Sequence, residues 1–150
     1  MAGPVHLVTS IDIRRPAEAV WPWLVDWEAL PRWMREMRSV RVLGARREGV
    51  GVEAVATVRV GGISTTDPIV VTRWEPPSVL EIEHHGWVRG VGYMELSPAE
   101  EGTHLFWRES LVPPWGLPGR VGFRVYRPLL ARTFARDLER LRDLIETPPG

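Results

Sequence analysis

The sequence predicts an α+β fold in which a curved antiparallel sheet of about seven strands wraps on a long C-terminal helix, with two short helices after the first strand. Three patterns carry this prediction. An alternating apolar segment opens the chain, similar segments with short connections fill its middle, and a long amphipathic segment ends it. A sheet with one apolar face needs a cover, and only the last segment is long enough to provide it.

The first strand is expected over residues 5–13, where apolar side chains alternate along one face. Pro16 follows it and suits the first turn of a short helix. Asp26 is expected to cap a second helix that runs through Met37. Spacings of three and four residues give this second helix one apolar face, formed by Leu30, Trp33, Met34 and Met37.

The middle of the chain predicts six further strands, at Val40–Arg47, Val52–Val60, Ile63–Trp74, Val79–His85, Trp87–Leu96 and Thr103–Val112. Gly61-Gly62 is a hairpin signal between two of them. Short connections favour antiparallel neighbours, so the strands should form a meander. The last segment, from about Arg120 to Glu146, predicts a helix with a single apolar stripe: Tyr126, Leu130, Phe134, Leu138, Leu141 and Ile145.

Length and composition favour one globular domain over residues 1–150. Nineteen basic and nineteen acidic residues cancel, which argues against a nucleic-acid partner. No apolar run approaches the roughly 20 residues of a membrane span and no signal peptide is recognisable, so a cytoplasmic protein is expected. The chain lacks Cys and Lys, which excludes thiolate nucleophiles and Schiff-base chemistry. Exclusive use of Arg as the cation is typical of a GC-rich, bacterial genome.

The stretch Arg15–Met34, RPAEAVWPWLVDWEALPRWM, follows the first strand with a Pro-containing turn, Val-Trp, Leu-x-Asp and Pro-x-Trp. This order resembles the N-terminal signature of the START/SRPBCC superfamily and, within it, the polyketide cyclase/dehydrase-type branch. The turn Glu101–Thr103 and the apolar ending Phe134–Leu141 are similar to the family too, so the resemblance covers essentially the whole chain. It implies the helix-grip fold, a deep cavity between sheet and long helix, and a hydrophobic small molecule as ligand.

Alternation along the strands predicts which side chains face this cavity. Several inward positions carry small residues, which leave space: Ala54, Ala56, Gly90 and Gly92. The polar side chains expected to point inward are Asp67, Arg73, His84 and Glu109 from the sheet and Tyr126 from the helix.

Arg73, His84 and Glu109 are the candidate catalytic residues. A cation that polarises a carbonyl, a His that transfers a proton and an acid that orients it would suit aldol cyclisation and dehydration. The resemblance to aromatase/cyclase-like proteins also implies that Arg73 and His84 face the cavity, although the second helix lacks the aromatic residues that those enzymes carry there. A buried Arg–Glu ion pair beside a satisfied His is the structural alternative.

The ligand-binding residues are expected to be Leu30, Met34, Met37, Ala56, Asp67, Gly92, Met94, Trp107, Tyr126, Leu130 and Phe134. Adjacent His84 and His85 point to opposite faces of a strand and cannot chelate together, so neither a metal nor an organic cofactor is expected. The loop Pro113–Gly119 carries Trp115 between prolines. A cavity lid, an exposed patch for a partner or membrane surface, and a linker whose Trp packs on the helix end are all compatible with this pattern.

Three functions are compatible with these features. The leading interpretation is a protein that binds a hydrophobic small molecule, polyketide- or lipid-like, in the cavity. The alternative is a cofactor-free polyketide cyclase or dehydratase that uses Arg73, His84 and Glu109. A lipid or quinone carrier that makes transient membrane contact is the third, and both a monomer and a homodimer fit the sequence.

Overall fold

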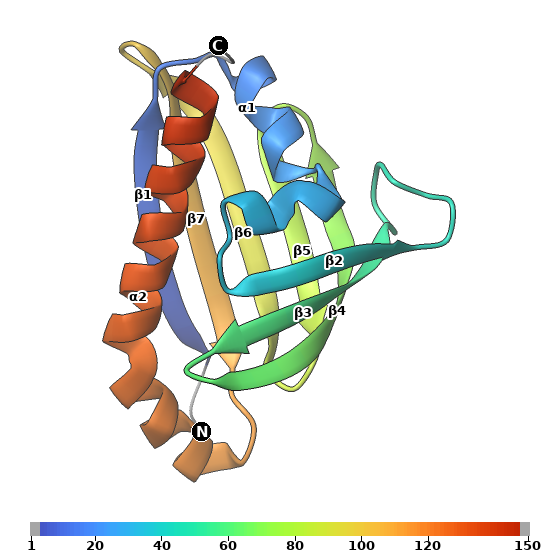
Figure 1. The fold of residues 1–150 in the computed structure, drawn as a ribbon, viewed down its shortest axis with the longest axis vertical. Coiled ribbons are helices and arrows are strands. Elements are labelled where there is room, and N and C mark those ends of the chain that lie inside the picture. The colour runs from blue at the N-terminus through green and yellow to red at the C-terminus, as the bar shows by residue number, and fades with distance from the viewer. Residues whose placement is uncertain (1–3, 148–150) are drawn as a thin grey trace.

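The computed structural model describes residues 4–147. Within this range seven strands form one antiparallel sheet in the spatial order β1-β7-β6-β5-β4-β3-β2 (Figure 1). The strands are β1 (Val5–Ile13), β2 (Met37–Leu43), β3 (Glu53–Val60), β4 (Ile63–Glu75), β5 (Val79–His85), β6 (Arg89–Ala99) and β7 (Gly102–Val112). From β2 to β7 each strand pairs with the next along the chain, so the predicted meander is confirmed.

One face of the sheet is covered by three helical segments, α1 (Ala17–Leu24), the 3₁₀-helix η1 (Trp27–Arg32) and α2 (Gly116–Glu146). The long helix α2 runs alongside β1 and β7, and α1 lies near its C-terminal end (Figure 1). The predicted helix-grip architecture is therefore confirmed, although α2 begins at Gly116 rather than at Arg120. Among the described residues, no helix is both long and apolar enough to cross a membrane.

The second predicted helix is wrong in length and in type. It was expected to run through Met37, but η1 ends at Arg32 and β2 already begins at Met37. Pro31 supplies the reason, since proline has no amide hydrogen to donate to the preceding turn. The apolar spacing that predicted a helix still buries its residues, because a tight turn followed by a strand points Trp33, Met34 and Met37 to the same interior.

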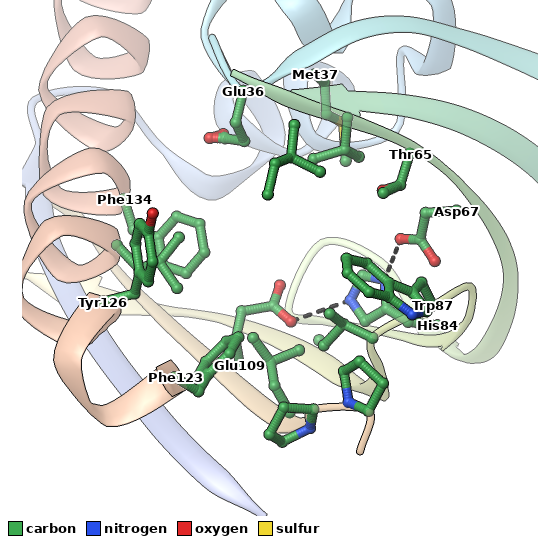
Figure 2. A pocket seen from close by; sticks show the side chains of 18 of the residues that line it. Glu36, Met37, Thr65, Asp67, His84, Trp87, Glu109, Phe123, Tyr126 and Phe134 are labelled. Carbon is green, nitrogen blue, oxygen red and sulfur yellow. Dashed lines mark hydrogen bonds and ion pairs between the residues drawn. The ribbon is translucent and has the colours of Figure 1, made fainter. Parts of the chain in front are cut away.

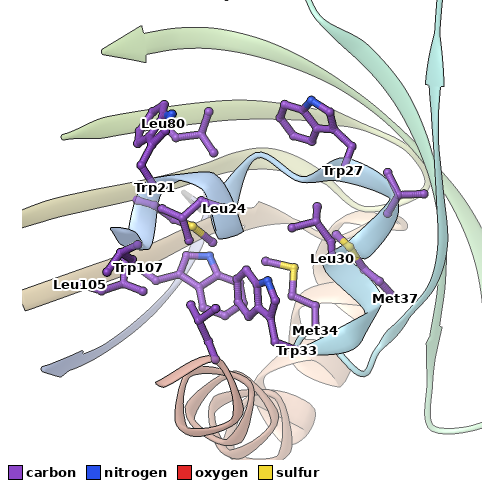
Figure 3. Close-up of a cluster of buried hydrophobic side chains, with 14 of the residues drawn as sticks. Trp21, Leu24, Trp27, Leu30, Trp33, Met34, Met37, Leu80, Leu105 and Trp107 are labelled. Carbon is purple, nitrogen blue, oxygen red and sulfur yellow. The ribbon is translucent and has the colours of Figure 1, made fainter. Parts of the chain in front are cut away.

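Tryptophan side chains hold the core together between the sheet and the C-terminal half of α2 (Figure 3). Trp33 is 1% exposed and packs edge-on against Trp107, with ring centroids 6.1 Å apart. Trp107 in turn lies against Phe134 of α2 at 4.6 Å. Trp21 of α1 packs edge-on against Trp74 of β4 at 5.4 Å. The aromatic contacts thus join the short helices, the sheet and α2 into one core.

We expect Trp33→Ala and Trp21→Ala each to lower the free energy of unfolding by about 3–5 kcal/mol, because each removes a large buried aromatic side chain and leaves a cavity. Denaturant titration measures the loss. Trp115→Ala is the matched control, since Trp115 is 70% exposed and its removal should cost under about 1 kcal/mol. Equal losses for the buried and the exposed tryptophans would contradict the packing described above.

Candidate functional site

A cavity of about 390 Å³ lies between the sheet and the N-terminal half of α2. Most of its wall is apolar, and a few polar side chains reach into it (Figure 2). Small-molecule sites in proteins commonly have this size and this mixture of groups. The structure places most of the predicted ligand-binding residues in the wall: Met34, Met37, Asp67, Gly92, Met94, Trp107, Tyr126, Leu130 and Phe134.

Two predicted ligand-binding residues, Leu30 and Ala56, do not belong to the cavity wall. Both are buried in the hydrophobic core instead. Leu30 lies in η1, which packs on the end of the sheet that the core fills. Ala56 is fully buried in β3, and its short side chain packs within the core.

Arg73 lies on the outer face of the sheet, so its predicted place in the cavity is wrong. It is half-exposed there and forms an ion pair with Glu75. The cause is a bulge in β4. Val71 pairs with Ile82 of β5, yet Arg73 pairs with the adjacent Glu81, so β4 holds one extra residue between these pairs. A bulge reverses the alternation of side chains beyond it, and Arg73 therefore points away from the site.

Asp67, His84 and Glu109, from β4, β5 and β7, meet in the cavity wall and are called the acidic triad below (Figure 2). His84 Nδ1 lies 2.7 Å from Asp67 Oδ2, and His84 Nε2 lies 3.0 Å from Glu109 Oε2. The indole N–H of Trp107 donates to Glu109 Oε1 at 2.9 Å, and the backbone N–H of Gly86 donates to Asp67 Oδ1 at 3.2 Å. Both ring nitrogens face carboxylate oxygens, so the imidazole satisfies both only as the doubly protonated cation.

The contact between His84 and Glu109 spans a whole strand, because β6 lies between β5 and β7. On β6, Gly90 pairs with His84 and Gly92 pairs with Glu109. A Cβ atom at position 92 would lie only 2.8 Å from Glu109 Oε1, which is closer than a Cβ atom approaches a non-bonded oxygen. The missing side chain at Gly92 therefore opens the gap through which Glu109 reaches His84. Alternation alone predicts that the space beside Gly92 is open to the ligand. In the structure the carboxylate of Glu109 occupies it.

The two carboxylates of the acidic triad keep the imidazole of His84 protonated. Burial by itself would lower the pKa of His84, but the charge of Glu109 and the hydrogen bonds that the imidazole donates to Asp67 and Glu109 outweigh burial and raise this pKa to about 10. The imidazole is therefore a cation at neutral pH, and neither nitrogen is free to act as a base. No group of three or more acidic or His side chains within residues 4–147 is arranged to hold a metal ion.

Glu36, between η1 and β2, is a further acidic residue in the cavity wall. Its carboxyl oxygens are both buried, and the protonated carboxyl of Glu36 forms a side-chain hydrogen bond with Asp137. Burial, then the nearby carboxyls of Asp137 and Glu109, raise the pKa of Glu36 to about 10. Burial also raises the pKa of Asp137, which lies on α2. Sequence patterns missed Glu36, because it lies between charged residues, Arg35 and Arg38, and the pattern gives no sign that its side chain is buried.

Aromatic side chains flank the opening of the cavity. Trp115 packs edge-on against Trp87 with ring centroids 4.9 Å apart, and both residues contribute to the wall. Trp115 is nevertheless 70% exposed, which excludes the linker alternative in which it packs on the end of the helix. Neither Trp87 nor the nearby Phe123 was among the predicted ligand-binding residues, because alternation does not reveal which residues border the opening.

The family model described as "Polyketide cyclase / dehydrase and lipid transport" matches residues 4–146. The chain belongs to this family. The match covers nearly all of the described fold, including every strand of the sheet and α2. It agrees with the resemblance that the N-terminal motif indicates. No curated protein matches the chain by sequence.

Solved structures share the fold along nearly their whole length. The protein TTHA0849 from Thermus thermophilus is 18% identical, with a TM-score of 0.81 over 94% of this chain and 97% of that one. The Zhui aromatase/cyclase from Streptomyces sp. R1128 is 15% identical, with a TM-score of 0.79 over 95% of this chain and 93% of that one. A START superfamily protein from Mycobacterium smegmatis is 16% identical, with a TM-score of 0.77 over 94% and 97%. At these identities the likeness shows a common fold.

The raised pKa of His84 predicts that stability depends on pH. The folded value of about 10 exceeds the unfolded value of 6.5, so the stabilisation is complete below pH 6.5 and is lost as the pH rises toward 10. The pKa of Glu36 is raised from 4.5 to about 10, so its proton also stabilises the folded state, and this stabilisation is lost as the pH rises above 4.5. We expect the free energy of unfolding to fall between pH 6.5 and 9.5, by up to about 1.4 kcal/mol per pH unit for each linked proton.

Glu109→Gln should make this decline shallower, because the variant removes the negative charge that most strongly favours the imidazolium. The control is Glu53→Gln, the same substitution at an exposed position of β3, which should leave the wild-type slope unchanged. Denaturant titrations at several pH values measure the slopes. Identical slopes in the wild type and Glu109→Gln would show that the charge of Glu109 does not hold the proton on His84.

Proposed function

We propose that this chain binds a hydrophobic small molecule, polyketide- or lipid-like, in the cavity between α2 and the sheet. The apolar wall is the observation that carries the proposal, since apolar surface facing a cavity of about 390 Å³ favours an apolar occupant over water. The description of the family supports both polyketide and lipid chemistry. An aromatase/cyclase and a START superfamily protein share the fold that encloses this cavity.

The cavity is tested by filling it. Val58 lines the cavity from β3, so Val58→Trp should occupy ligand space and weaken binding of the neutral dye N-phenyl-1-naphthylamine at least about tenfold, or ~1.4 kcal/mol. Val8→Trp is the matched control, because Val8 is 59% exposed on β1 and does not line the cavity. Fluorescence titration measures both affinities. A wild-type protein that does not bind the dye, or equal binding by both variants, would count against the proposal.

The enzymatic alternative, a cofactor-free polyketide cyclase or dehydratase, loses one of its three groups, because Arg73 lies outside the cavity. His84 and Glu109 remain in the wall. The imidazolium, flanked by two carboxylates and with a pKa of about 10, is a weak proton donor and cannot accept a proton at neutral pH. This chemistry supports binding as the leading function and places catalysis second.

The carrier alternative draws support from the surface beside the cavity opening. At the start of α2, four apolar side chains spaced by four residues are about half-exposed or more: Leu117, Val121, Val125 and Leu129. Trp115 extends this stripe toward the opening. The segment Gly116–Arg136 contains five arginines and no acidic residue. Apolar side chains among cations fit an anionic lipid surface, whereas a second copy would bring like charges together. We propose that this stripe contacts anionic membranes.

The wild-type protein should sediment with phosphatidylglycerol vesicles at low salt, less with phosphatidylcholine vesicles, and be released at high salt. Replacing Leu117 and Val125 together by Ser should weaken the association several-fold without unfolding the protein, because both side chains are exposed. Val8→Ser is the control, since it removes exposed apolar surface from β1. Equal association of all three proteins would contradict the docking surface. Concentration-dependent dimers lost only in the double variant would assign the stripe to a second copy.

A further inference from the structure

The cavity is long and narrow. Its wall follows β7 and the segment after it from Trp107 to Pro113, a distance of roughly 20 Å at about 3.3 Å per residue. On α2 the wall extends from Gly119 to Phe134, which is roughly 22 Å at about 1.5 Å per residue. A volume of about 390 Å³ spread over this length leaves a mean cross-section of roughly 20 Å². Strand and helix thus agree on a space that is several times longer than it is wide.

One end of this space is closed and the other is open. At the closed end the rings of Trp107 and Phe134 lie 4.6 Å apart, and the buried ring of Trp33 packs against Trp107 from the core side. At the open end the wall includes Trp87 and Trp115, which are both exposed. A ligand therefore enters past the exposed tryptophans and ends against the buried ones.

Methionine side chains gather in the wall of the cavity. Three of the four methionines of the chain, Met34, Met37 and Met94, line it, and all three are buried. Met94 of β6 pairs with Trp107 of β7, which places this methionine at the closed end. An unbranched thioether side chain adapts its rotamers to the shape that it contacts. These residues suit the flexible tip of an apolar chain.

The volume of the cavity limits how many chains it can hold. A methylene group fills roughly the 30 Å³ that a water molecule takes in the liquid, so 390 Å³ holds at most about 13 methylenes. Each acyl chain of a membrane lipid spans about half of the roughly 30 Å hydrocarbon core, which is close to the length of the cavity. One such chain fills the cavity, and a second chain beside it would need about twice the volume.

We infer that the cavity takes an amphiphile with a single apolar chain and excludes lipids with two. This inference rests on the proposed function of hydrophobic ligand binding and narrows its ligand class. The chain lies with its methyl end against Trp107 and Phe134 and with its polar end toward Trp87 and Trp115. The second chain of a two-chain lipid stays in solvent, where it adds nothing to the affinity.

Displacement of N-phenyl-1-naphthylamine by alkan-1-ols of eight to sixteen carbons measures the length of chain that the cavity holds. Their affinity should rise about fourfold with each added methylene, because each is buried, up to about 13 carbons, and stay level beyond. A pair of neutral glycerides, 1-monodecanoylglycerol and 1,2-didecanoylglycerol, tests the second chain. We expect the two-chain compound to bind no more than about threefold tighter, whereas a buried second chain would tighten binding more than about 1,000-fold.

Gly122→Leu fills part of the proposed chain space. Gly122 lies in the wall on α2, and a Cβ atom at this position would meet no other atom within 4 Å. The variant should fold, since leucine favours the helix more than glycine does, and the affinity should level off about three carbons earlier. Ala131→Leu is the matched control, because Ala131 is exposed on α2 and does not line the cavity. Thermal unfolding checks that both variants are folded.

The wild-type titrations alone decide the one-chain limit. An affinity that keeps rising to 16 carbons, or didecanoylglycerol binding more than about tenfold tighter than monodecanoylglycerol, would overturn this limit while hydrophobic binding stands. Bound dye that no alcohol displaces would do the same. An unchanged chain-length limit in folded Gly122→Leu would overturn the position of the chain along α2. Failure of the dye and of every alcohol to bind would overturn both the inference and the proposed function.

Discussion

The contact of Trp107 with Trp33 and Phe134 divides the space between sheet and helix into a filled half and a hollow half. On the filled side, Trp33 and the short helices pack against the C-terminal part of α2. On the hollow side, Trp107 and Phe134 form part of the cavity wall. A helix and a curved sheet enclose more volume than the side chains of this chain can fill. The aromatic contact decides where close packing ends and the ligand space begins.

The acidic triad depends on the same layout. Trp107 belongs to the core contact and also donates its indole N–H to Glu109, so the orientation of this carboxylate is tied to the packing behind it. The gap at Gly92 then lets Glu109 reach across β6 to His84. A charged His can be buried in an apolar wall because each ring nitrogen has a carboxylate partner. The site is therefore held by four adjacent strands and moves only if the sheet does.

The chemistry of the cavity depends on which charged side chains point into it. The bulge in β4 carries Arg73 to the outer face, where it pairs with Glu75, while Glu36, Asp67 and Glu109 stay in the wall. The charged groups among the described wall residues are acidic apart from His84, whose two ring nitrogens already face carboxylates. The arginines of the protein gather instead on the surface, including the part of α2 that flanks the opening. The segment Gly116–Arg136, which flanks the opening, has five arginines and no acidic residue, so its charge is opposite to that of the acidic groups in the cavity wall.

Local periodicity by itself determined the architecture and much of the site. Alternation along β5 and β7 placed His84 and Glu109 inward, and the helical stripe placed Leu130 and Phe134 against the sheet, because these periods are properties of a single element. The partnership of Asp67 with His84, the bulge that removes Arg73 and the approach of Glu36 to Asp137 were decided only by the tertiary structure. Each depends on strand register or on segments far apart in the chain, and counting residues along one segment carries no information about its neighbours.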